Sequence, residues 1–183
     1  METNPVYLVS TVDYRYFALL LPMQAAPNGE NSSKKPNRIG NTTTMTGYSG
    51  TPLPQKLGIK PGLTVVTING PANYRRLLGA IPEGVTFSDR LKADSSFVHV
   101  FIKTRTELEK RLPALREKVA DTGTVWVSWP KKSAGVPTDV TEDVVRAVAL
   151  PLGFVDVKVC AIDEIWSGLK LMVRRLNRKQ RVR

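Results

Sequence analysis

The sequence is poor in the residues that build covalent or metal-held frameworks. Its 183 residues include one cysteine, Cys160, and one histidine, His99. One cysteine excludes an internal disulfide and suits a reducing compartment. Together the two residues supply too few ligands for an ordinary zinc site, so no metal is predicted. Both lie within apolar stretches, and we interpret them as buried core residues, not as a base and a nucleophile.

The chain also lacks a long hydrophobic run. No segment approaches the roughly 20 apolar residues that span a bilayer. The best candidate, residues 16–23, is short and contains Pro22. It also makes a poor signal peptide, because the residues before it are not cleanly basic. With 42% hydrophobic residues the chain can still bury a normal core. We therefore expect a cytoplasmic protein without membrane contact.

Positive charge is plentiful but unevenly distributed. The net charge is +11, and residues 174–183 contain six basic residues and no acidic one. This basic tail predicts weak, non-specific contact with nucleic acid through phosphate groups. The rest of the chain is only mildly basic and carries no nucleic-acid recognition motif, so the tail would account for such binding.

The chain divides into three parts by composition. Residues 28–44 are polar and show no apolar periodicity, which is typical of disorder. We expect residues 1–44 to be a disordered or wrongly annotated extension, with Met45 as the true start. Residues 45–173 are predicted to form a single α/β domain, and residues 174–183 form the basic tail.

Strands and helices alternate along the predicted domain. Apolar runs and turn residues predict strands at 63–70, 85–87, 96–103, 124–128, 154–162 and 166–174. Helices are predicted at 71–79, after Thr104 and after Asp139; each of the last two has a glutamate three residues later, as in a capping box. This order predicts a small Rossmann-like three-layer sandwich, with a mostly parallel sheet and a C-terminal antiparallel hairpin. It resembles a reduced class I methyltransferase fold.

Four segments resemble a family of uncharacterised bacterial proteins, the domain of unknown function 3052. They are residues 45–62, 81–85, 125–146 and 152–175, and the similarity extends over about residues 47–175. Members of the family begin at or near the GYSGTPL segment, which supports Met45 as the start. The resemblance implies no established activity.

Polar residues follow the predicted strands at the edge where parallel strands end, and ligands usually bind at that edge. The candidate ligand-binding residues are Asn69, Gly70, Lys103, Trp129, Lys131, Lys132, Asp163 and Glu164. We interpret the loop at Trp129–Lys132 as an anion-binding loop, because two lysines precede a helix start. The alternative is that these lysines are merely solvated. Asp163 and Glu164 would then only fill the hairpin turn.

The sequence offers little for S-adenosylmethionine (SAM). A SAM site needs a glycine-rich turn after the first strand, but Asn69-Gly70-Pro71 has one glycine and a proline without an N–H. Asp89 is the acidic residue that could hold a ribose. We therefore predict no cofactor and, as the main hypothesis, a non-catalytic binding or regulatory module. The alternatives are an enzyme of methyltransferase-like fold acting on an anionic substrate, and a protein that binds nucleic acid through its tail.

Overall fold

The computed structural model describes residues 50–178 of the chain. The expectations for residues 1–44, and for residues 179–183 of the tail, lie outside this range. Within it, no helix is long and apolar enough to cross a membrane, and the cytoplasmic location stays a prediction. The α-helices and strands are α1 (Leu53–Leu57), β1 (Thr64–Ile68), α2 (Tyr74–Leu78), β2 (Thr86–Ser88), β3 (Ser95–Phe101), α3 (Arg105–Lys118), β4 (Val119–Pro130), α4 (Glu142–Ala149), β5 (Phe154–Ala161) and β6 (Trp166–Val173).

The six strands form one sheet in the order β2-β1-β3-β4-β6-β5. Strands β1 to β4 run parallel, whereas β6 lies antiparallel between β4 and β5. The chain passes from β1 to one neighbour, β2, and then crosses back to β3 on the other side of β1. The order therefore reverses at β1, and the carboxyl ends of β1 and β3 flank the switch point, where open α/β sheets bind their ligands.

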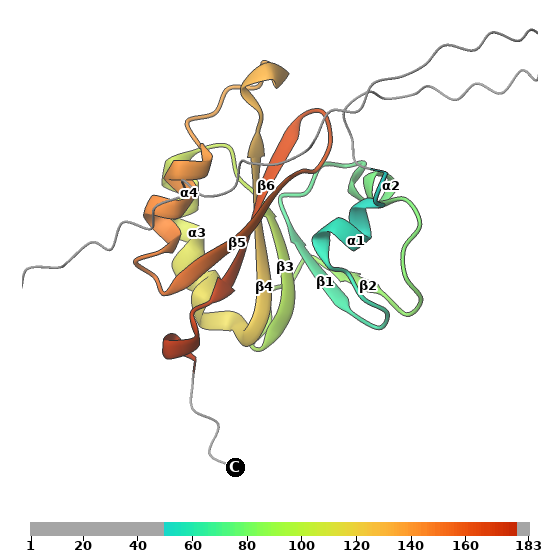
Figure 1. Cartoon of the computed structure of the whole chain (residues 1–183), viewed down its shortest axis with the longest axis horizontal. Coiled ribbons are helices and arrows are strands. Elements are labelled where there is room, and N and C mark those ends of the chain that lie inside the picture. The colour runs from blue at the N-terminus through green and yellow to red at the C-terminus, as the bar shows by residue number, and fades with distance from the viewer. Residues whose placement is uncertain (1–49, 179–183) are drawn as a thin grey trace, which may run out of the picture. The chain divides into compact units, whose positions relative to one another are not determined.

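Helices cover both faces of the sheet (Figure 1). On one face, Leu108, Leu112 and Leu115 of α3 pack with residues of α4 and with alternate residues of β3 and β4, such as Val98 and Val127. On the other face, α1 and α2 pack over the remaining residues of the same strands. The predicted three-layer α/β sandwich with an antiparallel C-terminal hairpin is confirmed.

The connection between β2 and β3 is short. Residues 89–94 lead from the carboxyl end of β2 to the start of β3 without forming a helix. Leu91 of this connection is half-buried and packs against the core on the α3 face of the sheet, together with Ile68. A single leucine thus supplies apolar cover that a crossover helix would otherwise give, and this keeps the fold small.

Several boundaries differ from the sequence-based expectations. Strand β4 begins at Val119, so residues 121–123 lie within the strand and do not end the preceding helix. The strand also continues through Trp129 to Pro130, because it pairs with β6 along that whole length. Helix α1 was not predicted; it packs on the sheet, and Leu57 O accepts a hydrogen bond of 2.9 Å from Trp126 Nε1.

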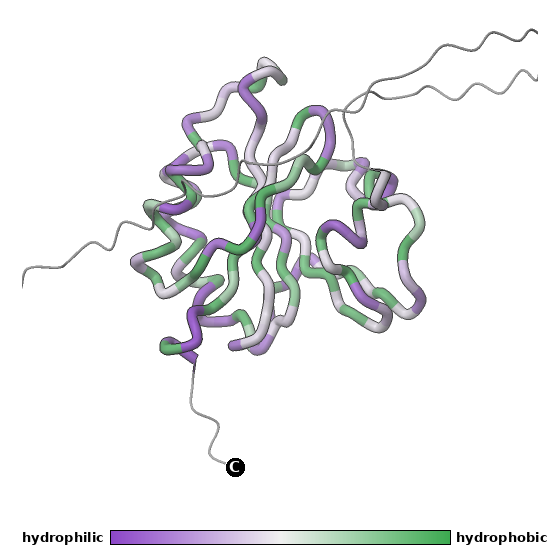
Figure 2. Tube along the Cα trace, in the orientation of Figure 1, coloured by the Kyte–Doolittle hydropathy of each residue, from purple (hydrophilic) through white to green (hydrophobic). Residues whose placement is uncertain are grey.

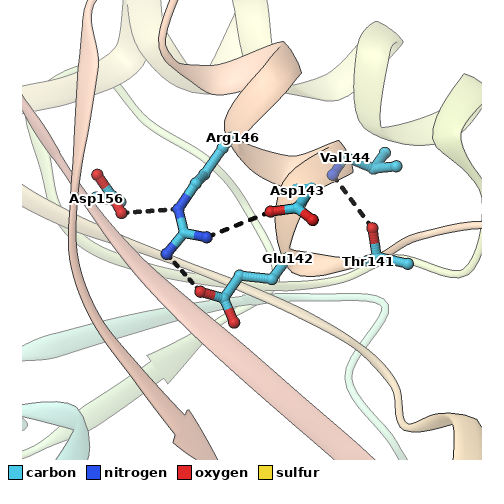
Figure 3. Close-up of polar contacts among 6 residues, drawn as sticks. All are labelled: Thr141, Glu142, Asp143, Val144, Arg146 and Asp156. Atoms are coloured by element: carbon cyan, nitrogen blue, oxygen red, sulfur yellow. Dashed lines mark hydrogen bonds and ion pairs between the residues drawn. The ribbon is translucent and has the colours of Figure 1, made fainter. Parts of the chain in front are cut away.

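Helix α4 begins later than predicted. Thr141 caps it, since its Oγ1 accepts a hydrogen bond of 3.3 Å from the backbone N–H of Val144. The expected cap, Asp139, instead accepts from the backbone N–H of Arg105 at 2.7 Å, which joins the starts of α3 and α4. In Figure 3, Arg146 of α4 reaches Asp156 of β5 and pairs with acids of its own first turn.

The α4 cap gives a direct test of this boundary. Thr141→Ala should lower the free energy of unfolding by about 1 kcal/mol, because the N–H of Val144 loses its acceptor. Thr141→Ser keeps the hydroxyl and should unfold like the parent in urea. Equal loss in both variants would show that Thr141 stabilises the protein through its methyl group and not as a cap.

Candidate functional site

A cavity of about 680 Å³ opens at the carboxyl ends of β1 and β2. This volume falls within the usual range for small-molecule sites. Ten residues from the ends of these strands and the start of α2 line it: Thr67, Asn69, Gly70, Pro71, Ala72, Tyr74, Arg75, Phe87, Ser88 and Asp89. The cavity therefore lies beside the point at which the strand order reverses.

The turn that follows β1 lies very close to the strand. A Cβ atom added to Gly70 would come within 2.5 Å of Thr67 Cγ2, a distance that real Cβ atoms do not show. Asn69 adopts a left-handed conformation with φ of 54°, which a non-glycine residue rarely takes. Its Nδ2 donates a hydrogen bond of 2.6 Å to Glu107 Oε1 on α3, and this contact fixes the turn from outside.

The polar groups of the cavity differ in their exposure. Thr67 Oγ1 is buried and has no hydrogen-bond partner within residues 50–178. A buried hydroxyl without a partner costs about 1–3 kcal/mol of stability. Asp89 follows β2 directly and is exposed at the cavity. One wall is aromatic, since the rings of Phe87 and Tyr74 contact each other edge-on. Arg75 Cζ lies 4.7 Å from the centroid of the Phe87 ring.

A buried hydrogen-bonded chain connects the cavity to the centre of the sheet. Tyr74 Oη lies 2.8 Å from His99 Nδ1, and Ser128 Oγ lies 2.8 Å from His99 Nε2. A neutral imidazole satisfies both neighbours by donating at one nitrogen and accepting at the other. Burial lowers the pKa of His99 to about 3, and burial also raises the pKa of Tyr74 above its usual range. The prediction of His99 as a satisfied core residue is confirmed.

The residues predicted from sequence divide between two places. Asn69 and Gly70 line the cavity. Trp129 lies within β4, and the remaining candidates follow β3, β4 and β5 along the same edge. Lys103 is exposed just beyond β3, and the backbone N–H of Lys131 donates to Ile165 O at 2.7 Å, next to the β5–β6 turn. In that turn Asp163 Oδ1 accepts from the N–H groups of Ile165 and Trp166, whereas Glu164 is exposed.

Trp129 and Lys132, which lie before and after Pro130, have different surroundings. Trp129 is 7% exposed and packs in the core on the α3 face, so its ring does not lie in the loop. Lys132 is exposed and begins a short 3₁₀ turn that ends at Ala134. An anion site formed by Lys131 and Lys132 stays a prediction.

Cys160 differs from its expected burial. It is half-buried, and burial raises the pKa of its thiol while Lys158 and Lys56 partly oppose this change. Most of the cavity residues, among them Thr67, Tyr74 and Phe87, have no signal in the sequence. Asp89 has one, as the acidic residue that could hold a ribose, but the single glycine before it makes that signal weak.

Comparisons with known proteins agree on the fold alone. No family model matches the chain and no curated protein matches it, so the resemblance to the domain of unknown function 3052 stays a prediction. A putative type 11 methyltransferase from Sulfolobus solfataricus is similar in structure, with a TM-score of 0.51 and 13% identity over 72% of this chain and 95% of that chain.

Two further structures are more distant. A SAM dependent methyltransferase from Aquifex aeolicus has a TM-score of 0.45 and 14% identity, over 65% of this chain and 86% of that one. A DhpI–SAH complex has a TM-score of 0.47 and 12% identity, over 68% and 83%. The prediction that the protein uses no cofactor is wrong, because the fold is the one shared with the putative type 11 methyltransferase.

The buried imidazole predicts a defined dependence of stability on pH. Below pH 6.5 the unfolded chain binds a proton at His99, whereas the folded chain does so only near pH 3. The free energy of unfolding should therefore fall as the pH drops through this window, by about 1.4 kcal/mol per pH unit from this group. His99→Gln keeps a donor and an acceptor but cannot titrate.

Urea unfolding at pH 6.5, 5.5 and 5.0 measures this effect. The difference in stability between the parent and His99→Gln should shrink toward low pH, since other groups titrate alike in both proteins. A constant difference across the three pH values would contradict a neutral, buried His99.

Proposed function

We propose that the protein is a SAM-dependent methyltransferase that binds SAM in the cavity at the ends of β1 and β2. The position of the cavity carries this proposal, because it lies at the carboxyl ends of β1 and β2, beside the switch point of a sheet with methyltransferase-like strand order. The shared fold supports the enzyme alternative more than the non-catalytic module.

Three residues fit a nucleoside-bearing cofactor. Gly70 lets the backbone of the turn lie against the end of β1, which leaves the cavity open above it. Asp89 stands at the end of the second strand, where a carboxylate can accept hydrogen bonds from the two ribose hydroxyls. Phe87 adds apolar surface on which a base could rest.

Two features set this site apart from a glycine-rich one. The turn holds a single glycine, and Pro71 supplies no N–H to the ligand. Helix α2 has only five residues, so the cofactor would depend on side chains more than on a helix terminus. We therefore expect the affinity for SAM to depend strongly on Asp89.

Bound SAM would supply an electrophilic methyl group, which passes to a nucleophile of the substrate and leaves S-adenosylhomocysteine. The chain's own part is to hold the cofactor and to exclude water. Lys103, Lys131 and Lys132 follow the neighbouring strands β3 and β4 at the same edge of the sheet. Their ammonium groups favour a methyl acceptor with negative charge, which is the substrate class that we propose.

Calorimetric titration of the purified chain with SAM tests the proposal. The parent should bind SAM, and Asp89→Ala should bind about tenfold more weakly or worse, since it loses hydrogen bonds to a charged acceptor. Glu83→Gln removes an exposed acid from the turn before β2, outside the cavity, and should bind like the parent. Absence of SAM binding by the folded parent, or equal affinity in all three proteins, would overturn the proposal.

A further inference from the structure

Four lysines gather on the face of the sheet that α1 covers only in part, away from the proposed cofactor cavity. They are Lys56 in α1, Lys60 just after it, Lys158 in β5 and Lys170 in β6. Lys158 and Lys170 are directly opposite each other on adjacent strands. Lys170 is also opposite Trp126 of β4, which places this pair on the α1 face.

Lys158 of β5 and Lys170 of β6 lie close to the backbone of α1 and of the turn that ends it. Lys158 Nζ lies 3.5 Å from Lys56 O. The backbone of Gly58, which ends α1 in a left-handed conformation, passes so near Lys170 that an added Cβ atom would lie 3.9 Å from its Nζ. Figure 2 shows that hydrophilic positions interrupt the hydrophobic path along β5.

The ammonium groups of Lys158 and Lys170 repel each other across the two strands. Like charges directly opposite on neighbouring strands destabilise a sheet. Burial lowers the pKa of Lys170, and the ammonium groups of Lys158 and Lys60 lower it further. The nearest acid of β5, Asp156, is opposite Leu171 on the other face and pairs there with Arg146.

We propose that this lysine face, formed by Lys56, Lys60, Lys158 and Lys170, binds the phosphate backbone of a nucleic acid. Anionic phosphates between the lysines relieve their mutual repulsion, and lysine serves as a point charge toward phosphate. The inference is independent of the cofactor proposal. It also differs from the expectation that the basic tail alone accounts for nucleic-acid binding.

A repeated phosphate fits the face better than a single one. Strand β6 leads from Lys170 to Arg174, and a residue advances a strand by about 3.3 Å, so these charges lie roughly 13 Å apart. Arg175 follows Arg174 and begins a short 3₁₀ turn. A single phosphate group meets only one of these positions, whereas a polymer reaches both.

An anionic membrane surface is the competing partner for this face. Peripheral membrane binding combines basic residues with exposed apolar side chains that insert between lipids. Val155 and Met172 on the lysine face are half-buried, but Val157 beside Lys158 is 52% exposed and Leu176 beside Arg175 is 92% exposed. The spacing of the charges along β6 is what favours a nucleic acid, and the vesicle measurement below separates the two partners.

Fluorescence anisotropy with a labelled 20-nucleotide single-stranded RNA and a matching DNA duplex, over a series of salt concentrations, tests the inference on the full chain. Lys158→Gln/Lys170→Gln should weaken binding about tenfold or more and should lower the slope of log K against log salt by roughly 1.8 for the duplex. The control Lys110→Gln/Lys118→Gln removes the same charge from exposed positions of α3 on the opposite face and should keep most of the affinity.

The melting temperature of each variant verifies its fold, and the single change Lys158→Gln, at an exposed position, provides a milder second variant. The affinity for SAM should be the same in both double variants and in the parent. This control separates failure of the nucleic-acid proposal from failure of the cofactor proposal. Equal loss in the two double variants would overturn the inference, because net charge alone would then explain binding. Stronger binding to vesicles with anionic lipid or to polyglutamate than to either nucleic acid would also overturn it.

Discussion

The close contact between the turn at Gly70 and the end of β1 is the constraint on which the site depends. Only a glycine permits it, because a Cβ atom would overlap Thr67. Since the turn lies so near the strand, space remains above it, and the side chains that follow β1 and β2 line that space. The left-handed Asn69 and its hydrogen bond to Glu107 hold the same turn against α3. The cavity is thus a consequence of backbone geometry more than of a glycine-rich sequence.

The interior of the sheet reinforces this arrangement. Tyr74 begins α2 at the cavity, and its hydroxyl is joined through His99 to Ser128, so β3 and β4 help to position the wall of the site. A buried network that is fully hydrogen-bonded favours one side-chain arrangement, because any other leaves a polar group unpaired. Phe101 stacks on the His99 ring at 4.4 Å and packs against Trp166, which extends the same rigid layer to β6.

Sequence patterns were sufficient for the fold class because the alternation of strands and helices, the α3 cap at Thr104 and the final hairpin all have local signals. They misplaced the start of α4, since Asp139 and Thr141 are both good caps and only the contact of Asp139 with α3 decides between them. They placed Trp129 in a loop, because a proline such as Pro130 usually ends a strand. In this protein Pro130 pairs with Trp166, so β4 continues through Trp129. The cavity could not be predicted, because it depends on how close Gly70 lies to Thr67 and on how the residues that follow β1 and β2 are placed side by side. The presence of one glycine in the sequence does not reveal these distances between residues.

Chemical-shift mapping tests most directly whether the cavity at the ends of β1 and β2 holds the cofactor. In ¹H–¹⁵N spectra of the full chain titrated with SAM, the account predicts the largest shifts at the amides of Thr67, Gly70, Ser88 and Asp89. The amides of Lys131 and Lys132, on the loop after β4, should shift little. Shifts confined to the loop after β4, or no shifts at SAM concentrations well above micromolar, would contradict it.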